Sequence, residues 1–233
     1  MARLAGLPYH GVVPVRNLGQ PRQNRVSPAG EIVAIRARGR AMGNRGQLTD
    51  PGGRVVRPWK LKRWICCTLR EVNGRKVRFD DPEGYTPLFF TDEAVALAAG
   101  HRPCGKCRPN GYFHWLAIFK KLAGISKFER VSADVMDREL HARRMNWSRS
   151  KLKTVRLYEA PEGAFVRLPA ASLDPLLVHK GCLWPWSEGC YGNPIEREGH
   201  YYESVQLFPQ AEFLIGGFRF DDELTPAPQA HSE

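Results

Sequence analysis

The sequence predicts an α+β protein made of a basic module with a β-hairpin and a helix, a helical connector and a small β-rich C-terminal domain. Three observations predict this class. Two runs typical of strands flank the hairpin-turn dipeptide Asn73-Gly74. Segments with helix caps and helical periodicity follow between residues 91 and 146. Beyond Pro161, short β runs broken by Pro and Gly replace the helical pattern.

Composition divides the 233-residue chain into five stretches. The first 30 residues hold four prolines and few apolar clusters, which indicates an extended arm. Both the residue pattern and the sign of the charge change near residues 155–160, which indicates a boundary. The predicted stretches are an extended basic arm (1–30), a metal-binding module (31–125), a basic helical connector (126–158), a β-rich domain (159–225) and a flexible tail (226–233).

The module begins with strand and turn patterns. Residues 31–38 (EIVAIRAR) alternate apolar and polar side chains, so we expect a strand with its arginines on one face. Residues 39–54 are rich in Gly, Asn and Asp, which is typical of tight turns and exposed backbone. The two strands of the predicted hairpin are residues 64–69 (WICCTL) and 76–79 (KVRF).

Three helices are predicted next. Thr91 precedes two acidic residues and an apolar run, so we expect it to cap a short helix that stops at Gly100. An amphipathic pattern predicts a second helix over 112–122. Ser132 is the expected cap of a third helix over 132–146. The residues expected on the buried stripe of this helix are Val135, Met136 and Leu140.

The C-terminal domain is predicted to consist of short strands. Its Trp184, Trp186 and Tyr191 lie around turns. They either stack on nucleobases or build the core of a small domain, and the sequence leaves both interpretations open. The predicted β runs are 163–168, 175–186, 204–208 and 212–220.

Charge is segregated along the chain. The net charge is +11 overall, but residues 1–79 carry +14 and residues 141–156 carry +6, whereas residues 157–233 carry −8. This asymmetry is typical of a nucleic-acid binder, because Lys and Arg that neutralise phosphates release counterions. The alternative is a solvated face that provides solubility. Since no apolar run is long enough for a membrane helix, we expect a cytoplasmic, nucleoid-associated protein that binds DNA, or alternatively RNA, and no membrane.

The candidate phosphate contacts are the basic residues of the N-terminal third and of the cysteine motif described next. Arg outnumbers Lys among them, and its planar guanidinium suits phosphate. They are Arg36, Arg38, Arg40, Arg45, Arg54, Arg57, Lys60, Lys62, Arg63, Arg102 and Arg108.

Cys104 and Cys107 form a C-x-x-C pair. This spacing brings two thiolates to one side of a tight turn, an arrangement that tetrahedral zinc accepts. A redox pair of the thioredoxin kind has the same spacing but follows a strand, whereas this pair follows a predicted helix and a glycine. In a cytosolic protein the six cysteines are expected to be reduced or metal-bound rather than disulfide-bonded. The thiols upstream of the pair are Cys66 and Cys67.

Residues 84–109 contain the run DEAVALAAGHRPCGKCRP. This stretch resembles the second half of the zinc-binding N-terminal domain of Ada, a family of DNA-repair proteins. The matching residues include Phe89, Phe90, Asp92, Glu93, Ala94, Gly100, Arg102, Pro103, Cys104, Cys107, Arg108 and Pro109. The resemblance implies a treble-clef-type module with zinc held by four cysteines, one of which accepts a methyl group from a DNA phosphotriester. Adjacent Cys66 and Cys67 replace the family's upstream C-x-x-x-C segment here.

The predicted zinc ligands are Cys67, Cys104 and Cys107, with Cys66 or a histidine as the fourth. Neighbouring side chains of a strand point to opposite faces, so Cys66 and Cys67 can both reach one ion only where the strand breaks or bulges. His101 takes the family's aromatic position, which indicates packing or a phosphate contact. The alternative is a metal-free fold whose cysteines are small core residues.

Asp137, His141 and Arg144 fall at helical spacing on one side of the third predicted helix. They could act as a general base and a phosphate clamp in a nuclease, or they could form a solvated surface. The function expected from the sequence is that of a zinc-stabilised DNA-binding protein in DNA repair or in defence against foreign DNA. The alternatives are an enzyme acting on DNA, as a nuclease, a base-processing or a methyl-accepting protein, and an RNA- or ribosome-associated factor.

Overall fold

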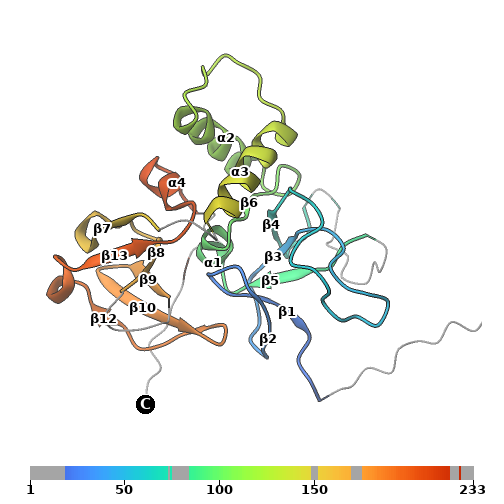
Figure 1. The fold of residues 1–233 in the computed structure, drawn as a ribbon, viewed down its shortest axis with the longest axis horizontal. Coiled ribbons are helices and arrows are strands. Elements are labelled where there is room, and N and C mark those ends of the chain that lie inside the picture. Colours follow the sequence, from blue (N-terminus) through green and yellow to red (C-terminus); the bar gives the residue numbers. More distant parts are fainter. Residues whose placement is uncertain are drawn as a thin grey trace, which may run out of the picture.

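The computed structural model describes residues 19–72, 74, 84–147, 152–168, 175–220 and 226. It confirms the α+β class, with two β-sheets and four α-helices in the described part of the chain. In Figure 1 the sheet of the N-terminal half and the sheet of the C-terminal half lie on either side of α1, and α2 and α3 lie beyond one end of that helix.

The N-terminal sheet has six strands in the order β2-β1-β5-β3-β4-β6. Two of its contacts are parallel, β1 with β5 and β4 with β6, and the other pairs are antiparallel. The strands are β1 (Gln23–Val26), β2 (Ile32–Ala34), β3 (Ala41–Asn44), β4 (Ile65–Thr68), β5 (Leu88–Phe90) and β6 (Arg102–Pro103).

Three predictions for this half are corrected. Residues 39–54 are predicted to form turns, but they contain β3, which lies between β4 and β5. Gly43, which looks like a turn residue in the sequence, is instead a close-packing residue, because a Cβ there would lie 2.5 Å from the Ile65 carbonyl oxygen. The stretch predicted as an extended arm contains β1, and the strand predicted over 31–38 is confined to β2.

The hairpin prediction is confirmed only in its first strand, β4. Asn73 and residues 76–79, the predicted turn and second strand, lie outside the described residues, as do residues 1–18 of the predicted arm. The partners of β4 in the described sheet are β3 and β6.

All three predicted helices are present, as α1 (Glu93–Ala98), α2 (Pro109–Leu122) and α3 (Ala133–Trp147). The cap of α1 is Asp92 rather than Thr91, because the Asp92 carboxylate accepts a hydrogen bond from the Val95 N–H. Ser132 caps α3 as predicted, with its hydroxyl accepting from the Val135 N–H. Met136 and Leu140 are buried, but the Val135 side chain is 42% exposed, so its prediction as a buried residue is wrong.

The C-terminal sheet has seven strands, in the order β11-β10-β9-β8-β13-β7 with β12 beside β10. Residues 212–220 are predicted as a strand, but Ala211–Ile215 form the helix α4. The reason is tertiary, because the Phe213 ring stacks on Trp115 of α2 with ring centroids 3.7 Å apart. The strands are β7 (Thr154–Arg156), β8 (Phe165–Arg167), β9 (Leu176–His179), β10 (Cys182–Ser187), β11 (Cys190–Tyr191), β12 (Ile195–Glu196) and β13 (Ser204–Leu207).

Helix α1 is buried along its whole length and connects the two sheets. The Tyr191 hydroxyl donates to the Asp92 carboxylate at 2.7 Å, and the Trp186 N–H donates to the Thr91 hydroxyl at 2.9 Å. These two aromatics of the C-terminal sheet are buried, with Trp184 packed beside them, so the structure favours the core interpretation of the aromatic group. The hydrophobic clusters therefore join residues on both sides of the boundary predicted near 155–160.

The helices in the described ranges are each too short or too polar to span a lipid bilayer.

Candidate metal centre and basic surface

Three of the four predicted metal ligands lie together. The sulfur atoms of Cys67, Cys104 and Cys107 lie within 4.8 Å of one another. Parallel pairing of β4 with β6 brings them together, because the Cys104 N–H donates to the carbonyl oxygen of Cys66, next to Cys67 in β4. The sulfurs thus come from two segments that are far apart in the sequence.

The backbone around Cys104 favours a thiolate. The N–H groups of Cys107 and Lys106 point at its sulfur, and α2 begins two residues after Cys107, with its positive dipole end toward the cluster. Hydrogen bonds from the thiols of Cys107 and Cys67 lower the pKa of Cys104, and the same contacts raise the pKa of Cys67. The three sulfur atoms are so close that one thiolate is favoured at the expense of the others. A bound cation would offset the repulsion between several thiolates, so the residues fit a thiophilic metal ion.

Cys66 lies outside this group of three. Its side chain packs in the core cluster of Phe90 and α1, whereas Cys67 packs beside Met42, so the two neighbours face opposite sides of β4 as strand geometry requires. Burial raises the pKa of the Cys66 thiol, which also contacts Arg108. Within the described ranges, no histidine or carboxylate completes the group either.

Two arginines beside the cysteine pair, Arg102 and Arg108, point into the protein, whereas Lys106 between the cysteines is exposed. Arg102 makes two hydrogen bonds of 2.7 Å to the Asp137 carboxylate of α3, and both side chains are buried. Arg108 forms a buried salt bridge with Glu93 of α1. Arg102 and Arg108, which the sequence predicts as phosphate contacts, are thus held by carboxylates of two helices.

A second buried group surrounds Arg45 of the segment that follows β3. The Arg45 side chain is 1% exposed and hydrogen-bonds to the carbonyls of Gly30 and Pro58 and to His101 Nε2. Arg45, which the sequence also predicts as a phosphate contact, is therefore buried rather than exposed to a phosphate. Its guanidinium carbon lies 3.9 Å from the centroid of the Trp64 ring, which indicates a cation–π contact.

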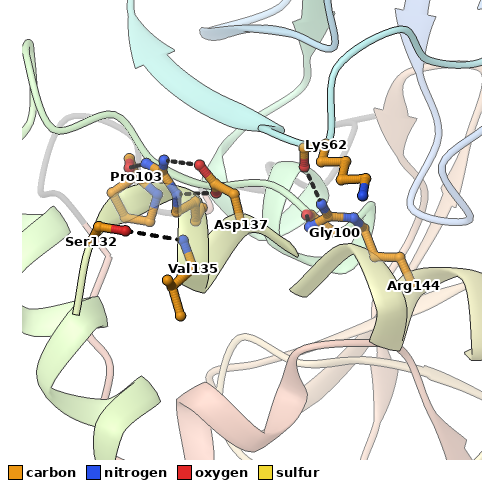
Figure 2. A network of polar contacts seen from close by, with 8 residues as sticks. Lys62, Gly100, Pro103, Ser132, Val135, Asp137 and Arg144 are labelled. Carbon is orange, nitrogen blue, oxygen red and sulfur yellow. Dashed lines mark hydrogen bonds and ion pairs between the residues drawn. The ribbon is translucent and has the colours of Figure 1, made fainter. Parts of the chain in front are cut away.

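Arg144 of α3 contacts the same Trp64 ring at 4.6 Å. Its guanidinium donates to the carbonyl oxygens of Gly100 at 2.9 Å and Lys62 at 2.6 Å, as Figure 2 shows. Gly100 has φ +87°, and a Cβ there would lie 2.6 Å from Arg144 Cδ, so only glycine permits this approach. Neither Arg45 nor Arg144 forms a salt bridge within the described part of the chain.

The three candidate catalytic residues are packed against other parts of the protein. Asp137 is paired with Arg102, and Arg144 is held by backbone carbonyls. His141 is buried, with its ring 4.4 Å from the ring of Trp59 in an edge-on arrangement. The structure brings these side chains to one side of α3, as the spacing predicts, but each of them holds a neighbouring segment in place.

The remaining predicted phosphate contacts are exposed. Five of them lie on the segment 54–63 between β3 and β4, which we call the basic loop. Arg54 pairs with Asp50, whereas the other four form no salt bridge within the described residues. These four are Arg57, Lys60, Lys62 and Arg63. Arg36, Arg38 and Arg40 are exposed on the segment after β2, where Arg36 donates to the Gly19 carbonyl.

Comparison of the chain with protein-family models, curated proteins and solved structures finds no match. The resemblance of residues 84–109 to the Ada family remains a prediction.

Two residues important for this region were not identified from the sequence. Trp64 is the ring that both buried arginines contact, and Glu93 is the buried partner of Arg108. Glu93 looks like an ordinary acidic residue of a helix first turn. The one available signal for Trp64 is its place in the run PWKLKRW, where aromatic and basic residues alternate.

Replacement of Asp137 by Ala is expected to lower the free energy of unfolding by about 3–5 kcal/mol, because it leaves the Arg102 charge buried and unpaired. Urea denaturation measures this change. The double variant Arg102→Met with Asp137→Leu should recover most of the loss. The matched control is Asp134→Ala, an exposed position on the same helix, with a change of less than about 0.5 kcal/mol. A small effect of Asp137→Ala alone would contradict a structural role for the pair.

The free energy of unfolding is expected to fall as the pH drops below about 6.5, which is the pKa of a histidine in the unfolded chain. Burial, with Arg45 and Arg144 nearby, lowers the pKa of His101 well below 6.5. In that window the unfolded state binds one more proton, so unfolding becomes easier by up to about 1.4 kcal/mol per pH unit.

The variant His101→Gln keeps a hydrogen-bond acceptor for Arg45 but does not titrate, so its urea midpoint should depend less on pH than that of the wild type. His114→Gln, at an exposed position, should behave as the wild type. Equal pH dependence in His101→Gln and the wild type would exclude His101 as the source of the effect.

Proposed function

We propose that the protein binds DNA through its phosphate backbone, with the basic loop as the main contact and a zinc ion as a structural element. The observation that carries this proposal is the position of Arg57, Lys60, Lys62 and Arg63. All four are exposed and lack a salt bridge within the described residues, so their charges are available to phosphates.

The basic loop is held in place from below by hydrogen bonds. Three of its backbone carbonyl oxygens accept hydrogen bonds from buried side chains. The Arg45 guanidinium donates to the Pro58 carbonyl, and the Trp64 indole N–H donates to the Leu61 carbonyl. The Arg144 guanidinium donates to the Lys62 carbonyl. The Lys60 and Leu61 N–H groups also donate to the Arg45 carbonyl at 2.9 Å. Because these backbone groups are bound to the interior, the basic side chains of the loop remain in solvent. A positioned set of cations loses less conformational freedom on binding DNA than a mobile one.

The buried cations add to the same electrostatic field. Arg45 and Arg144 have pKa values lowered to about 9, chiefly by burial, so both remain charged at neutral pH. No carboxylate salt bridge neutralises them in the described structure, and they lie directly beneath the loop. Their positive charge therefore reinforces the attraction of the loop for a polyanion.

Zinc is the metal that three convergent thiols favour in a site with no redox role. Cys67, Cys104 and Cys107 would hold it, and their clasp would tie β4 to the segment that leads into α2. Gly100 and Arg102 lie in that segment, so the clasp would also fix the carbonyl that Arg144 binds. The metal would thus support the base of the basic loop rather than contact DNA.

The variant with Lys60→Ala, Lys62→Ala and Arg63→Ala is expected to bind a labelled DNA duplex more weakly and with less salt dependence. Each lost phosphate contact should reduce the slope of log K against log salt by about 0.9, or about 2–3 in total. Fluorescence anisotropy at several salt concentrations measures this slope.

The control for this experiment removes the same number of charges elsewhere, with Lys121→Ala, Lys127→Ala and Arg130→Ala near the α2–α3 connection. It should retain nearly the wild-type slope. Equal slopes for the loop variant and the wild type would refute the basic loop as the DNA contact. A stronger competition by RNA than by DNA would favour the RNA alternative, and a cleaved or altered oligonucleotide would favour an enzyme.

Purified protein is expected to contain about one zinc ion per chain by elemental analysis. Cys67→Ser, Cys104→Ser and Cys107→Ser should each abolish or strongly reduce the zinc content, because each removes one of the convergent thiols. Cys66→Ser and Cys190→Ser should retain it. Loss of zinc from Cys66→Ser would identify Cys66 as a ligand and contradict the set of three.

A further inference from the structure

A cavity of about 430 Å³ lies between α3, the end of β13 and α4, apart from the three cysteines. Its volume is within the range of about 300–1,000 Å³ that is typical of small-molecule sites. Most of its wall is apolar, with Leu140 on the α3 side and Leu207, Phe208 and Pro209 on the β13 side. Its volume and lining suit a small apolar group, and none of the three cysteines lines it.

The polar part of the lining is mainly cationic. Arg143, Arg144 and Lys153 line the cavity, against the single carboxylate Glu212. Glu212 accepts a hydrogen bond of 2.9 Å from Arg143, which also pairs with Glu139, so these three charges largely satisfy one another. Lys153 is exposed and forms no salt bridge within the described ranges, and Arg144 Nε is buried without a hydrogen bond. The cavity thus offers an anionic group one exposed cation, Lys153, beside the buried charge of Arg144.

Gln210 adds an amide to this lining. Its side chain is 9% exposed, and both its amide nitrogen and its amide oxygen are buried without a partner. An unpaired buried donor and acceptor destabilise a fold, so rotation of the side chain that brings both groups onto a ligand in the cavity would be strongly favoured. The amide lies beside Arg144, since a Cβ on Gly100 would be 3.5 Å from Gln210 Nε2 and 2.6 Å from Arg144 Cδ. A donor and an acceptor side by side match the edge of a nucleobase, as in amide pairs with adenine.

Arg144 connects this cavity to the basic loop. The same guanidinium that lines the cavity donates to the Lys62 carbonyl of the loop at 2.6 Å. Figure 2 shows Lys62 and Gly100 on the same side of the Arg144 guanidinium. A strand whose phosphates follow the loop would therefore pass near the cavity.

We propose that the cavity binds one unstacked nucleotide of single-stranded DNA. The base enters the apolar space, the Gln210 side chain turns so that its amide pairs with the base edge, and the phosphate contacts Lys153 near the buried charge of Arg144. This inference rests on the proposed function, because phosphate binding by the basic loop brings the strand to the cavity. Extrusion of a base into such a pocket is a common mode of nucleic-acid recognition.

The test compares two labelled oligonucleotides of about 12 nucleotides, a deoxyadenylate strand and an abasic strand with the same number of phosphates. The wild type should bind the deoxyadenylate strand at least about 10-fold more tightly than the abasic strand. Gln210→Leu removes the amide at similar volume and should reduce this preference by about 5- to 100-fold, or abolish it. Its affinity for the abasic strand should not change, which also shows that the variant is folded.

A second variant and a control make the result specific. Ile215→Trp fills the cavity from an exposed position of α4 and should also remove the preference. Gln206→Leu, on β13 but not lining the cavity, should retain it. Equal affinity of the wild type for both strands, or an unchanged preference in Gln210→Leu, would overturn the proposal.

Calorimetry with deoxyadenosine monophosphate separates this proposal from the proposed function. If the wild type binds neither strand nor the labelled duplex at low salt, the proposed function fails and the cavity is judged on the free nucleotide alone. Binding of the free nucleotide that Gln210→Leu abolishes would then support a nucleotide site supplied from solution. Absence of any nucleotide binding would overturn the site itself.

Discussion

The buried guanidinium of Arg144 is the contact on which the functional half of the structure depends. A charged group in the interior needs hydrogen-bond acceptors, and the two terminal nitrogens of Arg144 find them in backbone carbonyls from two separate segments. One carbonyl belongs to Gly100, at the end of α1, and the other to Lys62, in the basic loop. The guanidinium therefore joins α3, the cysteine motif and the loop, and Arg144 also lines the cavity together with Gln210.

The four buried arginines around the cysteine motif and the basic loop differ in their partners. Arg102 and Arg108 each have a buried carboxylate partner, so they stabilise the junction of helices around the cysteine motif without adding free charge. Arg45 and Arg144 have backbone and ring partners instead, so their charge remains. The positive field of the surface thus has a buried contribution beneath the basic loop, and substitutions in the loop alone would not remove it.

The group of three cysteines and the contacts of α1 with the C-terminal sheet hold the two ends of the same short stretch of chain. Asp92 begins α1 and binds Tyr191 of the C-terminal sheet, while Cys104 follows Gly100 by four residues and joins the thiols of β4. The stretch between them is held at both ends, which explains how the left-handed Gly100 and the buried His101 can be kept in place. Loss of either anchor is expected to disturb the carbonyl that Arg144 binds.

The sequence by itself determined the α+β class, the three central helices and the strand that carries Cys67, because these follow from local periodicity and capping. It predicted Cys67, Cys104 and Cys107 as metal ligands, and the structure places their three sulfurs together. Only the tertiary structure decided that the glycine-rich residues 39–54 contain the strand β3 and that residues 211–215 are helical. It also decided which arginines face solvent. The sequence shows that Arg45, Arg102 and Arg108 are basic, but their burial depends on partners such as Asp137 and Glu93 that lie 35 and 15 residues away from Arg102 and Arg108. Long-range pairing of this kind is set by how the helices and sheets pack, and no local pattern records it.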